Sequence, residues 1–109
     1  MIAARVTEAY ANLFLTPKQD DGSRYSAIAR IGAFEVRLLE LPSVNSPERL
    51  GLWVELYDRD LRVGVDSYKC GDLDEAIDAA QLLAAQAGQQ SRGLSAMLLR
   101  AITNESMAA

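Results

Sequence analysis

The feature that most constrains the fold of this chain is an alternation of apolar and polar residues on both sides of a short polar turn, "DRD". The alternation has a period of two, which is the signature of a half-buried strand. It assigns two groups of side chains to opposite faces: Leu52, Val54, Leu56, Leu61, Val63 and Val65 on one, and Trp53, Glu55, Tyr57, Arg62, Gly64 and Asp66 on the other. Two antiparallel strands joined by a hairpin are therefore predicted.

Two further strands are predicted before this hairpin. Phe34, Val36 and Leu38 alternate with charged residues, and Pro42 closes the segment. A strand over residues 25–31 precedes it, with a tight turn at Gly32-Ala33. Short polar turns between successive strands favour an antiparallel meander of three or four strands.

Helices are predicted at both ends of the meander. Residues 3–14 carry one apolar stripe and are predicted to form a helix. Pro17 disfavours the helical conformation at the residue before it, so the helix should end there. A second helix is predicted over residues 73–87, because Asp72 and Glu75 have the spacing of a capping box and Gly88 suits a helix C-terminus. The segment "GQQSRG" is then expected to be a linker. A last helix is predicted from four apolar positions: Leu94, Leu98, Ala101 and Ile102.

These elements predict one domain, residues 1–109, of the α+β class: an antiparallel meander packed by an Ala-rich helix, with N-terminal and C-terminal helices. Three apolar-faced helices exceed what one face of a small sheet can cover, which favours a homodimer. The small-residue stripe formed by Ala76, Ala80 and Ala84 suits close packing against either the sheet or a second subunit.

The net charge of −4 is unevenly distributed along the chain. Residues 48–78 hold nine acids against four bases, a net charge of −5. A basic protein partner therefore suits this acidic half better than nucleic acid does. No apolar run is long enough to span a membrane. The chain start lacks the features of a signal peptide, and a single cysteine fits a reducing compartment, so a soluble, cytoplasmic protein is expected.

The composition offers little for catalysis. The chain has no histidine, which removes the commonest general base and metal ligand. Cys70 lies near acids that oppose a thiolate, so we interpret it as a buried junction residue rather than a nucleophile. Asp58 and Asp60 resemble part of a metal loop, but ordinary turn chemistry explains them. We predict no cofactor, no metal site and no enzymatic activity, with carboxylate catalysis by Glu55, Asp58 and Asp66 as a third alternative.

The polar side of the predicted sheet is the candidate binding surface. Trp, Tyr and Arg are the residue types enriched at binding hot spots. The alternation places four of them together as candidate binding residues: Arg37, Trp53, Tyr57 and Arg62. Two alternatives stay open. Trp53 packs under a helix instead, or a one-residue register slip inverts the two faces.

Residues 34–87 are similar in outline to the three-strand-plus-helix DNA-binding domains of plant AP2 factors and phage integrase arms. The likeness consists of the strand order, the single Trp in "GLWVELYD" and the Ala-rich helix "DLDEAIDAAQLLAAQ". Those domains read DNA with a basic sheet face, whereas this stretch is acidic, so the resemblance implies no function here.

The sequence therefore favours a small non-enzymatic protein that acts through protein–protein contacts as a homodimer. Its interaction surfaces are expected to meet a second copy or a basic partner. The alternative is a nucleic-acid-binding module that uses the sheet face through the four candidate residues.

Overall fold

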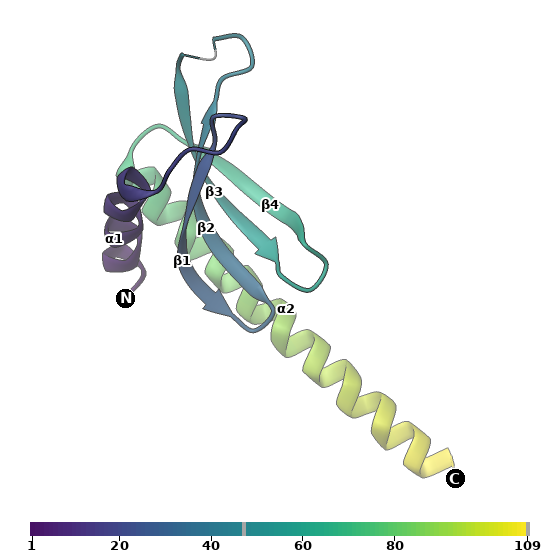
Figure 1. Ribbon diagram of the computed structural model, residues 1–109. Helices are drawn as coiled ribbons and strands as arrows, with labels where there is room; N and C mark the ends of the chain where they lie inside the picture. Colours follow the sequence, from purple (N-terminus) through teal and green to yellow (C-terminus); the bar gives the residue numbers. More distant parts are fainter. Residues whose placement is uncertain (47, 109) are drawn as a thin grey trace.

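The computed structural model describes the backbone of residues 1–46 and 48–108, and the side chains of residues 1–46 and 48–90. Its elements follow one another as α1 (Ile2–Leu15), β1 (Arg24–Ile31), β2 (Phe34–Pro42), β3 (Leu50–Asp58), β4 (Val63–Cys70) and α2 (Leu73–Ala108). The four strands form one antiparallel sheet in sequence order (Figure 1). The predicted α+β class and antiparallel meander are confirmed.

Both helices pack on the same face of the sheet, and the core lies between. Side chains at alternate positions of the two central strands point into it with no exposed surface: Val36, Leu38, Val54 and Leu56. From the helices come Val6, Ala9, Leu13, Ala76, Ala79, Ala80, Leu83 and Ala87. The alanines have almost no side chain to hold the helix away, so α2 can lie close to the strands. Within one chain, the small-residue stripe therefore faces the sheet.

The start of α2 forms as its sequence predicts. The Glu75 amide donates to the Asp72 carboxylate at 2.8 Å, and the Glu75 carboxylate accepts from the Gly71 amide. The first bond satisfies a donor that the first helical turn leaves unpaired, and the second ties the residue before the cap to the helix. β4 ends at Cys70 and α2 begins at Leu73, so Cys70 and Gly71 form the strand-to-helix junction.

The predicted break at Gly88 is wrong, because α2 continues as one helix to Ala108 and projects past the sheet (Figure 1). Glycine costs only about 1 kcal/mol relative to alanine inside a helix. Ala87, Gln89 and Gln90 are helix-compatible neighbours that offset it. The predicted last helix is thus part of α2, and its apolar side chains lie outside the described residues.

A register shift in β4 corrects the predicted faces of that strand. Leu56 lies opposite Asp66, but Tyr57 lies opposite Gly64, so Val65 is an extra residue. Such a bulge changes which side chains share a face. Asp66 therefore lies on the helix-covered face, contrary to the prediction, and Val65 is exposed.

Two adjacent leucines of α2 test how this helix packs. Leu83 is fully buried, whereas Leu82 is 62% exposed. We expect Leu83→Ala to lower the free energy of unfolding by about 2–5 kcal/mol, because it leaves a cavity. Leu82→Ala is the matched control and should change it by less than about 0.5 kcal/mol. Urea unfolding followed by Trp53 fluorescence measures both. Equal losses would contradict the packing described here.

Candidate functional site

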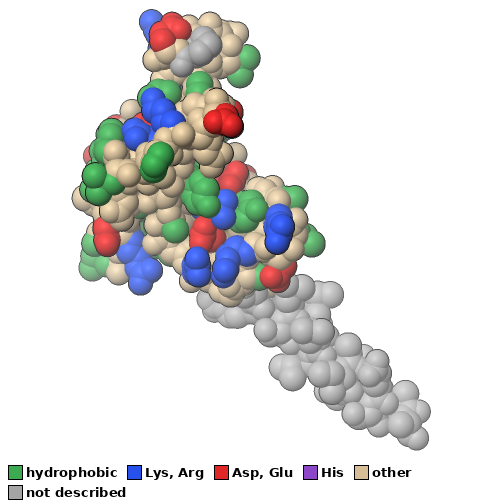
Figure 2. Space-filling model, in the orientation of Figure 1, with side chains coloured by type: hydrophobic (Ala, Val, Ile, Leu, Met, Phe, Trp, Pro, Cys, Tyr) green, Lys and Arg blue, Asp and Glu red, His purple; other side chains and the backbone are tan. Residues whose placement is uncertain are grey.

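The face of the sheet opposite the helices carries the candidate site, here called the open face. The register places on it Tyr25, Ala27, Arg30, Glu35, Arg37, Leu39, Leu41, Trp53, Glu55, Tyr57, Ser67 and Lys69. Positively and negatively charged side chains are interspersed with hydrophobic ones over the strands in Figure 2. The open face is therefore a mixed aromatic and charged surface.

A cluster around Arg37 organises the centre of the open face. Its guanidinium lies over the Tyr57 ring, 3.6 Å from the centroid, and over the Tyr25 ring at 4.3 Å. Arg37 Nε also donates to Glu35 Oε1 at 2.7 Å, and Arg30 Nε donates to Glu35 Oε2 at 3.0 Å. The planar guanidinium suits stacking and directed hydrogen bonds together.

Glu35 is buried although it belongs to this open face. Only 4% of the residue is exposed, and its two carboxylate oxygens each accept a bond from an arginine. Burial raises the pKa of the Glu35 carboxyl, but hydrogen bonds and charge from Arg37 and Arg30 outweigh that effect, so its pKa lies below the ordinary value. The cluster thus has its charges paired internally.

Glu55 occupies a different environment beside the cluster. Burial raises the pKa of its carboxyl above the ordinary value, and the charge of Arg37 opposes this only in part. A Cβ atom at Gly64 would lie 2.7 Å from Glu55 Oε2, so the glycine makes room for this carboxylate. Asp58 and Asp66 lie on the opposite face by register. The three acids of the carboxylate-catalysis alternative therefore do not converge.

Three of the four predicted binding residues share the open face. Arg37 lies opposite Glu55, Glu35 lies opposite Tyr57, and Leu39 lies opposite Trp53. Trp53 is half-buried on this face, away from both helices, so the alternative that it packs under a helix is not what the structure shows. The binding role of these three residues stays a prediction.

Arg62 is not on the open face. It lies in the turn between β3 and β4, with a φ of 58° in the left-handed region. The loop between these strands covers residues 59–62, whereas the predicted turn covers residues 58–60, so the predicted strand starts two residues before β4 does. Burial of Glu35 and the part played by Tyr25 were also missed, because both depend on cross-strand neighbours that the sequence does not place.

The other chemical candidates from the sequence are the pair Asp58 and Asp60 and the thiol of Cys70. Asp58 Oδ1 accepts from the amides of Asp60 and Leu61, which is turn chemistry. No group of three or more His, Cys, Asp and Glu that could hold a metal ion occurs in the described part of the chain. Burial raises the pKa of the Cys70 thiol, and the charge of Glu75 adds to this, which opposes thiolate formation.

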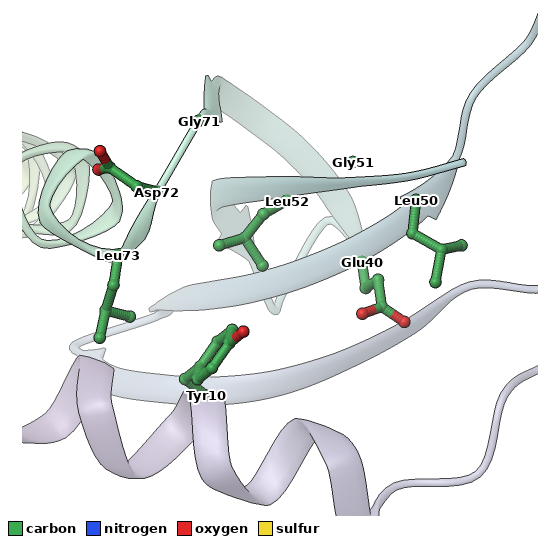
Figure 3. Close-up of a pocket in the computed structure, with 8 residues that line it drawn as sticks. All are labelled: Tyr10, Glu40, Leu50, Gly51, Leu52, Gly71, Asp72 and Leu73. Atoms are coloured by element: carbon green, nitrogen blue, oxygen red, sulfur yellow. The ribbon is translucent and has the colours of Figure 1, made fainter.

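A cavity of about 280 Å³ lies between α1, the strand ends and the start of α2. Figure 3 shows Tyr10 and three leucine side chains around it, with Glu40 at one side and Asp72 turned toward α2. Glu40 accepts from Arg24 Nε at 2.9 Å, and Asp72 caps α2. Both carboxylates near this cavity are therefore already engaged within the fold.

Comparisons with protein-family models, curated proteins and solved structures found no significant match to this chain. The outline likeness to AP2 and integrase-arm domains is thus unsupported. Among the described residues, neither helix has the length and apolar character needed to cross a membrane.

Glu35 and Glu55 should contribute to stability with opposite pH dependence. The native pKa of Glu35 is lowered, so its ionised form stabilises the fold above the unfolded pKa of about 4.3, and this contribution is lost as the pH falls through the native pKa. We expect Glu35→Gln to cost about 1–3 kcal/mol at pH 7 and progressively less below pH 4.

The Glu55→Gln variant is the control, because its effect on the free energy of unfolding should change with pH in the opposite direction. The native pKa of Glu55 is raised, so stability is lost as the pH rises through that value. Its replacement by Gln should therefore become more favourable, relative to the wild type, between pH 4 and pH 7. Urea unfolding at a series of pH values measures both effects. Parallel pH profiles for the two variants would contradict the arrangement described.

Proposed function

We propose that this protein is a non-enzymatic protein–protein interaction module that forms a homodimer through its open face. The observation that carries the proposal is the gathering of Tyr25, Trp53, Tyr57 and Arg37 on a sheet face that neither helix covers. These residue types contribute most to binding energy at protein interfaces. The free, buried state of the only cysteine supports a cytoplasmic location.

Charge balance favours a second copy as the occupant of the open face. A twofold dimer places the same surface against itself, so a strongly charged surface repels its own copy. Of the side chains that the register places here, Arg30, Arg37 and Lys69 are cationic, and Glu35 and Glu55 are anionic. A near-neutral face of this kind can associate with itself without large repulsion.

The size of the open face suggests a dimer of modest affinity. Four strands of eight or nine residues, about 4.8 Å apart and rising about 3.4 Å per residue, give a flat area of roughly 19 × 29 Å, or about 550 Å² per copy. A standard interface buries about 800 Å² per partner. A dissociation constant in the micromolar range is therefore expected.

The same geometry weighs against the nucleic-acid alternative. Nonspecific binding needs cations that are free to neutralise phosphates. Of the three cations on the open face, Arg37 is stacked on two tyrosines, and Arg37 and Arg30 are bonded to Glu35. Lys69 is the one cation of this face without an ion pair among the described residues. Arg62 lies in a turn instead. The charges of the face thus support contact with protein more than contact with a polyanion.

An added side chain on the open face should weaken the dimer. Ala27 is an exposed residue directly opposite Arg37, so Ala27→Lys adds bulk and charge without removing a buried contact. Light scattering behind a sizing column should show a wild-type mass that rises from monomer to dimer with concentration. The variant should need about tenfold more protein to reach the same mass.

The control for this experiment is Ala4→Lys, on the exposed side of α1, which should associate like the wild type. A wild type that stays monomeric up to millimolar concentration would contradict the proposal. So would an Ala27→Lys variant that associates as readily as the control.

A titration with random-sequence duplex DNA separates the two functions. We expect no measurable binding between 50 and 200 mM salt. Affinity that falls steeply with added salt, by about 10³-fold or more over this range, would instead favour the nucleic-acid alternative.

A further inference from the structure

The edge strand β4 differs from the opposite edge of the sheet. β1 is packed by α1, whereas β4 pairs with β3 and, among the described residues, has no strand or helix beside its outer edge (Figure 1). Most of β4 is exposed, including the apolar residues Val63, Val65 and Tyr68. An exposed edge presents backbone N–H and C=O groups that another extended segment can pair with.

A groove runs between β4 and α2 on the helix-covered side of this edge. It has a volume of about 320 Å³. Tyr68, Ala79 and Leu82 line its apolar part, and Leu82 and Tyr68 are 62% and 42% exposed. A strand added to β4 would direct every second side chain toward this groove, because successive side chains of a strand alternate between faces.

Acidic side chains flank the apolar part of the groove. Glu75 and Asp78 lie along α2, and Asp78 is exposed. They belong to the segment of residues 48–78, whose net charge is −5. Lys69 also borders the groove, but its register position opposite Trp53 directs its side chain to the open face. The charge of the groove therefore favours a positively charged occupant.

The acids make a second copy a poor occupant of this edge. Antiparallel pairing of two β4 strands would bring their acidic flanks together about a twofold axis. Asp66 contributes a further negative charge in β4, and its carboxylate accepts a hydrogen bond from the Ser67 amide at 2.9 Å. Like charges directly opposite one another on two paired strands are destabilising, so two copies of this edge should pair poorly.

We propose that the groove between β4 and α2 binds an extended basic segment of a partner protein, which pairs with β4 as a fifth strand. The segment carries an apolar residue and a Lys or Arg two positions apart on the side that faces α2. The apolar residue packs against Tyr68 and Leu82, and the cation pairs with Asp78. This site lies on a different part of the sheet from the open face and does not depend on self-association.

Three synthetic peptides probe the site. The first, acetyl-Val-Thr-Lys-Thr-Val-Thr-Lys-amide, presents Val and Lys alternately on one side of a strand. The second has Glu in place of both Lys residues. The third has Pro in place of the central Thr, which removes a backbone donor. Binding is measured by titration of the ¹⁵N-labelled full chain, followed through its backbone amide signals.

We expect the Lys peptide to perturb amides of β4 and of the first two turns of α2, with affinity that falls as salt is added. The Glu and Pro peptides should bind at least about tenfold more weakly. Leu82→Ala and Asp78→Lys should each weaken binding of the Lys peptide by about three- to tenfold. Ala4→Lys, at a distant exposed site, should not change it.

Three outcomes would overturn the proposal: no binding of the Lys peptide at millimolar concentration, equal binding of the Glu peptide, or perturbations confined to the open face. In the Ala27→Lys variant, shifts of the β4 amides with protein concentration alone would identify a second copy as the occupant of the groove and would also overturn the proposal. The Ala27→Lys variant keeps the two proposals separate, because its self-association should be weakened while its binding of the Lys peptide is unchanged.

Discussion

The packing of the alanine-rich stripe of α2 on one face of the sheet is the contact on which the rest of the structure depends. Ala76 and Ala80 have no exposed surface, and they let the helix lie close to Val54 and Leu56. Because α1 packs on the same face, all of the large buried core lies on one side of the strands. No helix packs on the opposite face, so it must be stabilised by its own side chains. This uncovered face is the candidate interaction surface.

The open face is stabilised by a cluster of paired charges and aromatic rings rather than by a second apolar layer. Glu35 would be costly to bury alone, but two arginines satisfy its oxygens, and two tyrosines cover the guanidinium of Arg37. The result is a face that is aromatic and nearly neutral. The acids gather instead around β4 and the first turns of α2. We therefore propose different partners for the two surfaces, a second copy for the open face and a basic segment for the groove.

Local patterns in the sequence predict most of the fold. The period of two predicts the strands, Thr16-Pro17 predicts the end of α1, and Asp72 with Glu75 predicts the start of α2. The bulge in β4 was not predicted, because the alternation of apolar and polar residues continues through it and gives no sign of the unpaired residue. Asp66 was misplaced for that reason, and Arg62 was misplaced because the loop between β3 and β4 extends to residue 62. Gly88 was assigned to a helix end because glycine is common there. Whether a helix continues through a glycine depends on the residues of the neighbouring turns, which a local pattern does not include. Tyr25 joins the site through cross-strand pairing, and the burial of Glu35 depends on cross-strand neighbours, which one sequence does not specify.

The most direct test of self-association uses the only tryptophan of the chain, which lies on the open face. The indole N–H signal of Trp53 can be followed by NMR while the protein is diluted, with the solution mass measured on the same samples. A dimer through the open face predicts that this signal shifts over the same concentration range in which the mass doubles. An indole signal that stays constant while the mass doubles would contradict it, as would a mass that stays monomeric throughout.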